Sequence, residues 1–177
     1  MAERPIDFGT VTRIEADAVG PPGQRRFRLV VFNENLSACL WMEKEQLHAL
    51  ALAIEQVFGE LTGNPLRSTL PPSGPVAPLR DLPRRWSVEF TVGRLGLGYD
   101  RETNQFLLVA HDTESDPEGE PTFRCQATRP QMKALSQRAL ALVYAGRPRC
   151  PLCGAPLAGG SHVCARMNGH VAHEPDA

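Results

Sequence analysis

The chain has 177 residues, a length typical of one domain, and 42% of them are hydrophobic, which suffices for a packed core and excludes global disorder. Its 19 basic and 20 acidic side chains leave a net charge near −1, which argues against a strongly basic nucleic-acid binder. The longest apolar run, residues 139–145, is far shorter than the ~20 residues of a membrane span, and residues 1–30 lack the apolar centre of a secretory signal. We therefore expect a cytoplasmic protein that does not contact a membrane.

The pattern of apolar residues in the first part of the chain predicts strands followed by a helix. Phe27, Leu29 and Val31 alternate with other residues as in a strand with one buried face, and a Gly-Pro-Pro-Gly turn at residues 20–23 precedes them. A second strand is expected over residues 36–42. The apolar spacing then changes to steps of three and four residues, which predicts an amphipathic helix over residues 43–60. We assign residues 1–64 to the first half of the core.

A proline-rich stretch follows, with six prolines between Pro65 and Pro83. Because proline favours extended chain and no periodic pattern remains, residues 65–85 are predicted to form a linker or a strap on the surface. Three arginines lie next to Trp86 at its end, a composition that could contact nucleic acid but that fits a solvated surface better in a chain of balanced charge.

Residues 86–147 predict a second unit of strands and a helix. The strand that begins at Trp86 is followed by a hairpin turn at residues 100–104 and a partner strand at residues 105–111. Thr128 and Gln131 have the spacing of a helix capping box. The five residues from Gln46 align with the five from Gln131 at an offset of 85, which favours an internal repeat, although short amphipathic segments also match by chance. We predict an α+β fold of two β-rich halves, each ending in a helix, with an antiparallel sheet and both helices packed on it.

The strongest chemical signal lies in the tail, residues 148–177. Cys150 and Cys153 form a C-x₂-C pair, and a structural zinc site takes four ligands. His162 and Cys164 are two residues apart, so both reach the same side of an extended segment. The tail has few apolar residues, and so short a module usually needs a metal or a disulfide to fold. We predict a structural Zn²⁺ held by Cys150, Cys153, His162 and Cys164, with His170 ranked second for the fourth place.

An ordered series of motifs resembles the bacterial domain-of-unknown-function family 3090. The motifs are VGPPGQRRF at residues 19–27, MEKEQ at 42–46, GRP at 146–148 followed by CPLCG at 150–154, GSHVC at 160–164 and RMNGH at 166–170. The family pattern has Gly-His-x-Cys, whereas Ser161 separates Gly160 from His162 here. The resemblance implies a shared fold and carries no established activity. Genes of the family lie beside those of a lipid-kinase-like protein and a histidine phosphatase, which implies at most a shared pathway.

From these features we expect a non-catalytic binding or adaptor protein with a protein partner, in which zinc fixes the shape of the tail. One alternative is an enzyme that acts on a phosphorylated small molecule, which predicts a concave pocket where Arg13, Arg25 or Arg28 near the Gly-Pro-Pro-Gly turn meets a carboxylate with a perturbed pKa. A second alternative, less favoured because of the balanced charge, is a weak nucleic-acid binder that uses the zinc tail.

Two further features are expected to have no chemical role. The acidic loop at residues 112–120 has Pro117 and Phe123 where an EF-hand needs Gly and Glu, so a solvated loop is favoured over a calcium site. Cys39 and Cys125 lie on apolar strand faces, where a buried and inert thiol is the usual state.

Overall fold

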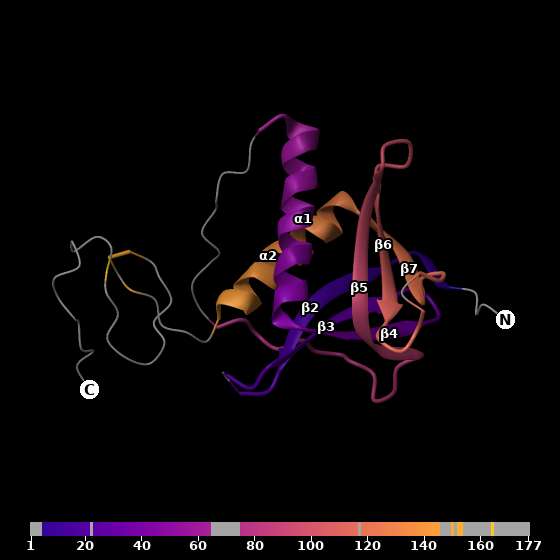
Figure 1. Cartoon of the computed structure of the whole chain (residues 1–177), viewed down its shortest axis with the longest axis horizontal. Helices are drawn as coiled ribbons and strands as arrows, with labels where there is room; N and C mark the ends of the chain where they lie inside the picture. Colours follow the sequence, from indigo (N-terminus) through magenta and orange to yellow (C-terminus); the bar gives the residue numbers. More distant parts are fainter. Residues whose placement is uncertain are drawn as a thin grey trace.

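The computed structural model describes residues 5–21, 23–64, 75–116, 118–145, 150, 152–153 and 164. These residues form an α+β fold in which one seven-stranded sheet packs with two helices (Figure 1). Neither helix is both long enough and apolar enough to span a bilayer. The elements in chain order are β1 (Ile6–Thr10), β2 (Arg13–Val19), β3 (Arg26–Phe32), β4 (Ser37–Met42), α1 (Lys44–Thr62), β5 (Val88–Asp100), β6 (Gln105–Asp112), β7 (Phe123–Thr128) and α2 (Arg129–Tyr144).

The sheet is mixed, with the strand order β1-β7-β6-β5-β4-β3-β2. Within each half the neighbouring strands are antiparallel, from β2 to β4 and from β5 to β7. The halves are joined by two parallel pairs, β4 with β5 and β1 with β7. The prediction of an antiparallel sheet is therefore wrong at both junctions. A parallel pair requires a crossover connection, and between β4 and β5 that connection contains α1 and the proline-rich segment.

The two edge strands of the sheet follow one another in the chain. Only Val11 and Thr12 separate β1 from β2. The Val11 N–H donates to Gln126 O of β7 (2.8 Å), and the Thr12 N–H donates to Phe32 O of β3 (2.8 Å). The sheet must therefore curl until its two edges meet at these residues, so that one concave face encloses the core.

In the first turn of each helix, a glutamine side chain donates a hydrogen bond to the backbone of the other half of the fold. Gln46 and Gln131 stand at the third position of α1 and α2, and each accepts a hydrogen bond from the backbone of its own cap residue, as in a capping box. Gln46 Nε2 also donates to Val92 O (3.1 Å), where the register of β5 shifts. Gln131 Nε2 donates to Val11 O (3.0 Å), in the break between β1 and β2. Both helix starts thus contact an irregular point of the opposite half, which is the register shift in β5 for Gln46 and the break between β1 and β2 for Gln131.

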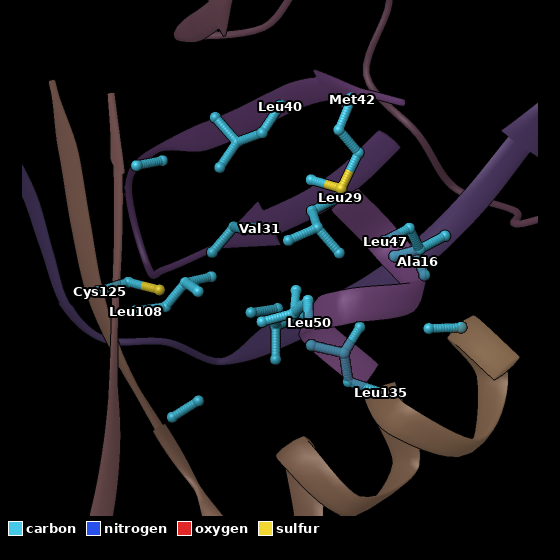
Figure 2. Close-up of a cluster of buried hydrophobic side chains, with 14 of the residues drawn as sticks. Ala16, Leu29, Val31, Leu40, Met42, Leu47, Leu50, Leu108, Cys125 and Leu135 are labelled. Atoms are coloured by element: carbon cyan, nitrogen blue, oxygen red, sulfur yellow. The ribbon is translucent and has the colours of Figure 1, made fainter. Parts of the chain in front are cut away.

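The core lies between the concave face of the sheet and the two helices. Figure 2 shows side chains from β3, β4, β6 and β7 meeting those of α1 and α2. Full burial of a leucine contributes about 1.5–3 kcal/mol, so this cluster is the main source of stability for the described core. The fully buried leucines of the cluster, each with 0–1% of its surface exposed, are Leu29, Leu40, Leu47, Leu108 and Leu135.

The described part of the proline-rich segment, residues 75–85, runs along α2 and β2 towards β5 (Figure 1). Val76 packs against the core, and Arg138 Nη2 donates to Ala77 O (2.7 Å). Arg13 of β2 lies 3.4 Å from Arg80 O through both terminal nitrogens. This segment is therefore bound to the surface of the second helix and the first half of the sheet.

Candidate metal centre

Three of the four predicted ligands fall in the described part of the chain, and they lie together. The sulfur atoms of Cys150, Cys153 and Cys164 are all within 4.8 Å of one another. Cys150 and Cys164 are 6% and 4% exposed, and Cys153 is half-buried. His162 and His170 lie outside the described residues. The three cysteines therefore lie close enough together to hold one ion, and their role as ligands, like the fourth ligand, stays a prediction.

The spacing of the sulfurs fits an ion better than a disulfide. Cys150 Sγ and Cys164 Sγ are 3.8 Å apart, and no two of the five cysteines form a disulfide. A disulfide would need about 2.05 Å. In a tetrahedral zinc site, Zn–S bonds of about 2.3 Å place neighbouring sulfurs about 3.8 Å apart. The pair forms an S–H···S hydrogen bond at a separation that two ligands on one tetrahedral ion would also have.

The turn after Cys150 favours the thiolate form. The backbone N–H of Cys153, and to a lesser extent that of Leu152, donates to the Cys150 sulfur and lowers the pKa of that thiol, against the opposing effect of burial. The thiolate is the form that binds a metal. The Leu152 side chain is 45% exposed, and Leu152 contributes to the site through its backbone N–H. The C-x₂-C spacing thus places two N–H groups where a thiolate needs donors.

The other two cysteines have the opposite environment. Burial raises the pKa of Cys39 to about 11 and that of Cys125 to about 12. Cys39 is fully buried and Cys125 is 1% exposed. A thiol with so high a pKa is a poor nucleophile and a poor ligand near neutral pH. The prediction that both thiols are buried is confirmed, and their lack of reactivity stays a prediction.

The arginines around the Gly-Pro-Pro-Gly turn bond to protein groups. Arg28 donates to Asp17 Oδ2 from Nε (3.0 Å) and Nη2 (2.7 Å), and both side chains are at least 86% buried. Its guanidinium lies 5.2 Å from the Trp41 ring. Arg25 Nη1 donates to Ala145 O (3.1 Å), and Arg13 forms an ion pair with Glu15. These three arginines therefore bond to other groups of the protein, on the outer face of the sheet and at the end of α2.

The acidic loop also binds its own backbone. Asp112 Oδ1 accepts from the Glu114 N–H (3.1 Å), and Asp116 Oδ1 accepts from the Glu118 N–H (3.0 Å). Carboxylates that cap local turns in this way are typical of a solvated loop. Among the described residues, the cysteine cluster is the one group of three or more potential ligands close enough to share an ion.

A groove between α1 and β5 was not predicted from the sequence. It has a volume of about 370 Å³ and opens to solvent. The signals that could have indicated it are the small residues Ala49 and Ala53 at helical spacing and Gly93 and Gly96 in the facing strand. These small residues form a groove only because α1 lies beside β5. The two elements are far apart in the sequence, so the sequence does not indicate that they are neighbours.

Comparison with known proteins identifies the family. A family model described as "Protein of unknown function (DUF3090)" matches residues 6–164, and the chain belongs to this family. The match includes the three clustered cysteines and nearly all described residues. No curated protein and no solved structure matches the chain.

Proposed function

We propose that this DUF3090 protein is a non-catalytic binding or adaptor protein whose C-terminal segment, residues 148–177, is organised by a structural zinc ion. The observation that carries the proposal is the cluster of Cys150, Cys153 and Cys164, with sulfurs within 4.8 Å and two of the three residues buried. Three thiols gathered without a disulfide form a donor set that suits zinc. The ion would fix the fold of the segment, and its outer surface would contact a protein partner.

His162 is the proposed fourth ligand. It stands two residues before Cys164, and His170 is the second choice. A site with three thiolates and one imidazole has no open position, and closed sites of this kind are structural. The lowered pKa of Cys150 supports the same assignment, because its donors come from the turn itself.

A binding role fits the observation that charged side chains in the described core form ion pairs with one another. Arg28 pairs with Asp17, and Lys133 Nζ donates to Glu55 Oε2 (2.6 Å) between the two helices. Such groups stabilise the fold and are not free for acid–base chemistry. The phosphorylated-substrate alternative would require its three arginines to leave their present partners.

Elemental analysis of protein purified without added zinc tests whether the chain binds Zn²⁺. We expect about one Zn²⁺ per chain in the wild type and a loss of most of it in Cys150→Ser. His162→Ala should weaken zinc retention more than His170→Ala does, and the reverse order would move the fourth ligand to His170. A wild-type stoichiometry near zero would contradict the proposal.

The partner is tested by cross-linking pull-down from cells that express the protein. Full-length bait is compared with a bait that ends at Arg149, which retains every described helix and strand. We expect the full-length bait to recover at least one protein that the shorter bait loses. Equal recovery by both baits would contradict a contact role for the C-terminal segment.

The paired glutamines also support an internal duplication. The halves β2-β3-β4-α1 and β5-β6-β7-α2 have the same order of elements, and Gln46 and Gln131 have the same contacts with the opposite half. A duplicated ancestor would account for both.

A further inference from the structure

The open groove between α1 and β5 lies beside an unpaired length of strand. Residues 88–91 of β5 pair with β4, whereas residues 92–100 pair only with β6. On the side where β4 has ended, the described residues supply no further strand partner for residues 94–100. An unpaired edge offers backbone N–H and C=O groups to an added strand. The groove therefore combines a sheet edge with the side of a helix.

The equivalent groove in the other half is bridged and occupied. Arg138 of α2 donates from Nε to Ala16 O of β2 (2.6 Å) and from Nη2 to Ala77 O (2.7 Å). The backbone of the extended segment at Val76 and Ala77 is thereby held beside α2 and β2, and the Val76 side chain packs against the core. One extended peptide thus fills the space next to the second helix.

The first half lacks the residue that makes this bridge. The offset of 85 that relates Gln46 to Gln131 places Ala53 of α1 at the position of Arg138. Gln131 bonds to Val11 O and Gln46 bonds to Val92 O, so the strand positions of the two halves are related by an offset of 81 residues. By the same offset, Leu97 of β5 corresponds to Ala16 of β2. Ala53 and Leu97 both line the open groove. The space that Arg138 and the extended segment fill in one half is therefore open in the other.

The lining defines the chemistry of an occupant. The residues that line the groove are mainly small or apolar, and polar character comes from Gln46 and Arg94. Arg94 is exposed, and its Nη2 lies 3.1 Å from His111 Nε2. No carboxylate in the described part of the chain pairs with Arg94. The groove thus offers apolar contacts, a strand edge and one positive charge.

We propose that this groove binds an extended peptide segment of a partner protein, with apolar side chains at alternate positions and an Asp or Glu that pairs with Arg94. The segment would add to the open edge of β5 and pack on Ala49 and Ala53, as residues 76–77 pack in the other half. The backbone would supply affinity, and the alternate side chains and the acid would supply specificity. This inference rests on the proposed binding role and is independent of the metal.

The probe is a phage-displayed library of random linear peptides, selected on the full-length protein and counter-selected on Ala53→Arg. The substitution places a bulky charged side chain in the space that the peptide would occupy. Leu52→Arg is the matched control, because Leu52 is 46% exposed, adjoins Ala53 and does not line the groove. We expect enriched peptides with alternating apolar residues and an acid. Their Kd should rise at least tenfold in Ala53→Arg and less than twofold in Leu52→Arg.

Two further variants keep the test decisive. Ala49→Arg blocks the same groove from an exposed helix position and serves if Ala53→Arg unfolds. Arg94→Gln should remove the preference for an acidic peptide, whereas Arg101→Gln, an exposed arginine at the tip of the same hairpin, should not. No enrichment, or enriched peptides that bind both blocked variants as well as wild type, would overturn the proposal.

Other occupants give distinguishable results. If a synthetic peptide of residues 165–177 binds the groove as tightly as the selected peptides, the occupant is this chain's own C-terminus and the partner proposal is wrong. If the wild type is a dimer and Ala53→Arg a monomer, the occupant is a second copy, and the proposal is equally wrong. If the pull-down recovers a partner that Ala53→Arg also retains, the groove proposal fails while the binding role stands.

Discussion

Cys125 in the core and Cys150 in the C-terminal segment carry the same side chain in opposite environments. In the core, hydrocarbon surrounds the Cys125 sulfur and raises its pKa to about 12. In the cysteine cluster, backbone N–H groups point at the Cys150 sulfur and lower its pKa. The core thus keeps a thiol neutral as a small apolar group, whereas the turn in the cluster favours a thiolate, the form that binds metals. If the proposed ion is present, the two regions are stabilised by different forces, and each prediction below perturbs one of them.

The largest effect is expected from a cavity in the core. Leu29→Ala removes a fully buried side chain from β3 and should lower the free energy of unfolding by about 2–5 kcal/mol. Chemical denaturation measures this loss. Leu52→Ala, at an exposed position of α1, should cost less than about 1 kcal/mol. The zinc content per folded chain should not change in either variant, and a loss of zinc in folded Leu29→Ala would show that the two regions are not independent.

Alkaline pH should destabilise the core through its buried thiols. The pKa of Cys125 is about 12 in the folded chain and near 9.0 when unperturbed, so between these values the unfolded chain loses a proton that the folded chain keeps. Stability therefore falls as pH rises above about 9, by up to about 1.4 kcal/mol per pH unit for one thiol. The loss is measured by denaturation at pH 8–11. Cys125→Ala should have a flatter profile, and an unchanged slope would contradict the assignment.

The helix-start glutamines should contribute equally in the two halves. Gln46→Ala and Gln131→Ala each remove a capping interaction and a bond to a strand of the opposite half, and each should cost about 1–2 kcal/mol. Gln56→Ala is the control, since Gln56 is exposed on α1 and bonds only to Glu60. Thermal unfolding compares the three variants. A loss in Gln56→Ala as large as in Gln46→Ala would refute the role given to the helix starts.

The local elements followed from the sequence better than their pairing did. Alternation predicted the strand that became β3, and the hairpin turn at residues 100–104 predicted the strand that became β6. The spacing of apolar residues predicted α1 within two residues at each end. The capping box at Thr128 is present as expected. β1 was not predicted, because it is short and only Phe8 of its residues is buried. The parallel pairs escaped prediction since they join residues far apart in the chain, and periodicity carries no information about which strands become neighbours.

The cysteine cluster was predictable because its chemistry is local. Metal-ligand spacing is set by the turn that carries the ligands, and a C-x₂-C pair specifies such a turn directly. The groove beside Ala53 was not predictable in the same way, because it exists only through the approach of α1 to β5. The arginines of the Gly-Pro-Pro-Gly turn were plausible anion ligands in the sequence, but Arg28 is occupied by Asp17, a partner 11 residues earlier.

A smaller effect is expected on thiol reactivity. At pH 8 in the presence of a zinc chelator, Cys150 should react with iodoacetamide within minutes, because removal of the ion exposes to solvent a thiol that is only 6% exposed in the folded site. Cys39 and Cys125 should stay unmodified in the folded chain, since burial holds their pKa values at about 11 and 12. Mass spectrometry of tryptic peptides measures the contrast. Equal modification of Cys125 and Cys150 in folded protein would remove the proposed difference between the regions.

Hydrogen–deuterium exchange with and without a zinc chelator tests the central claim most directly. Chelation should abolish protection in peptides that contain residues 150–164 and leave the protection of residues 26–62 and 88–144 unchanged. Restoring Zn²⁺ should return the original pattern. Protection of residues 150–164 that persists in protein shown to be free of metal would contradict the account.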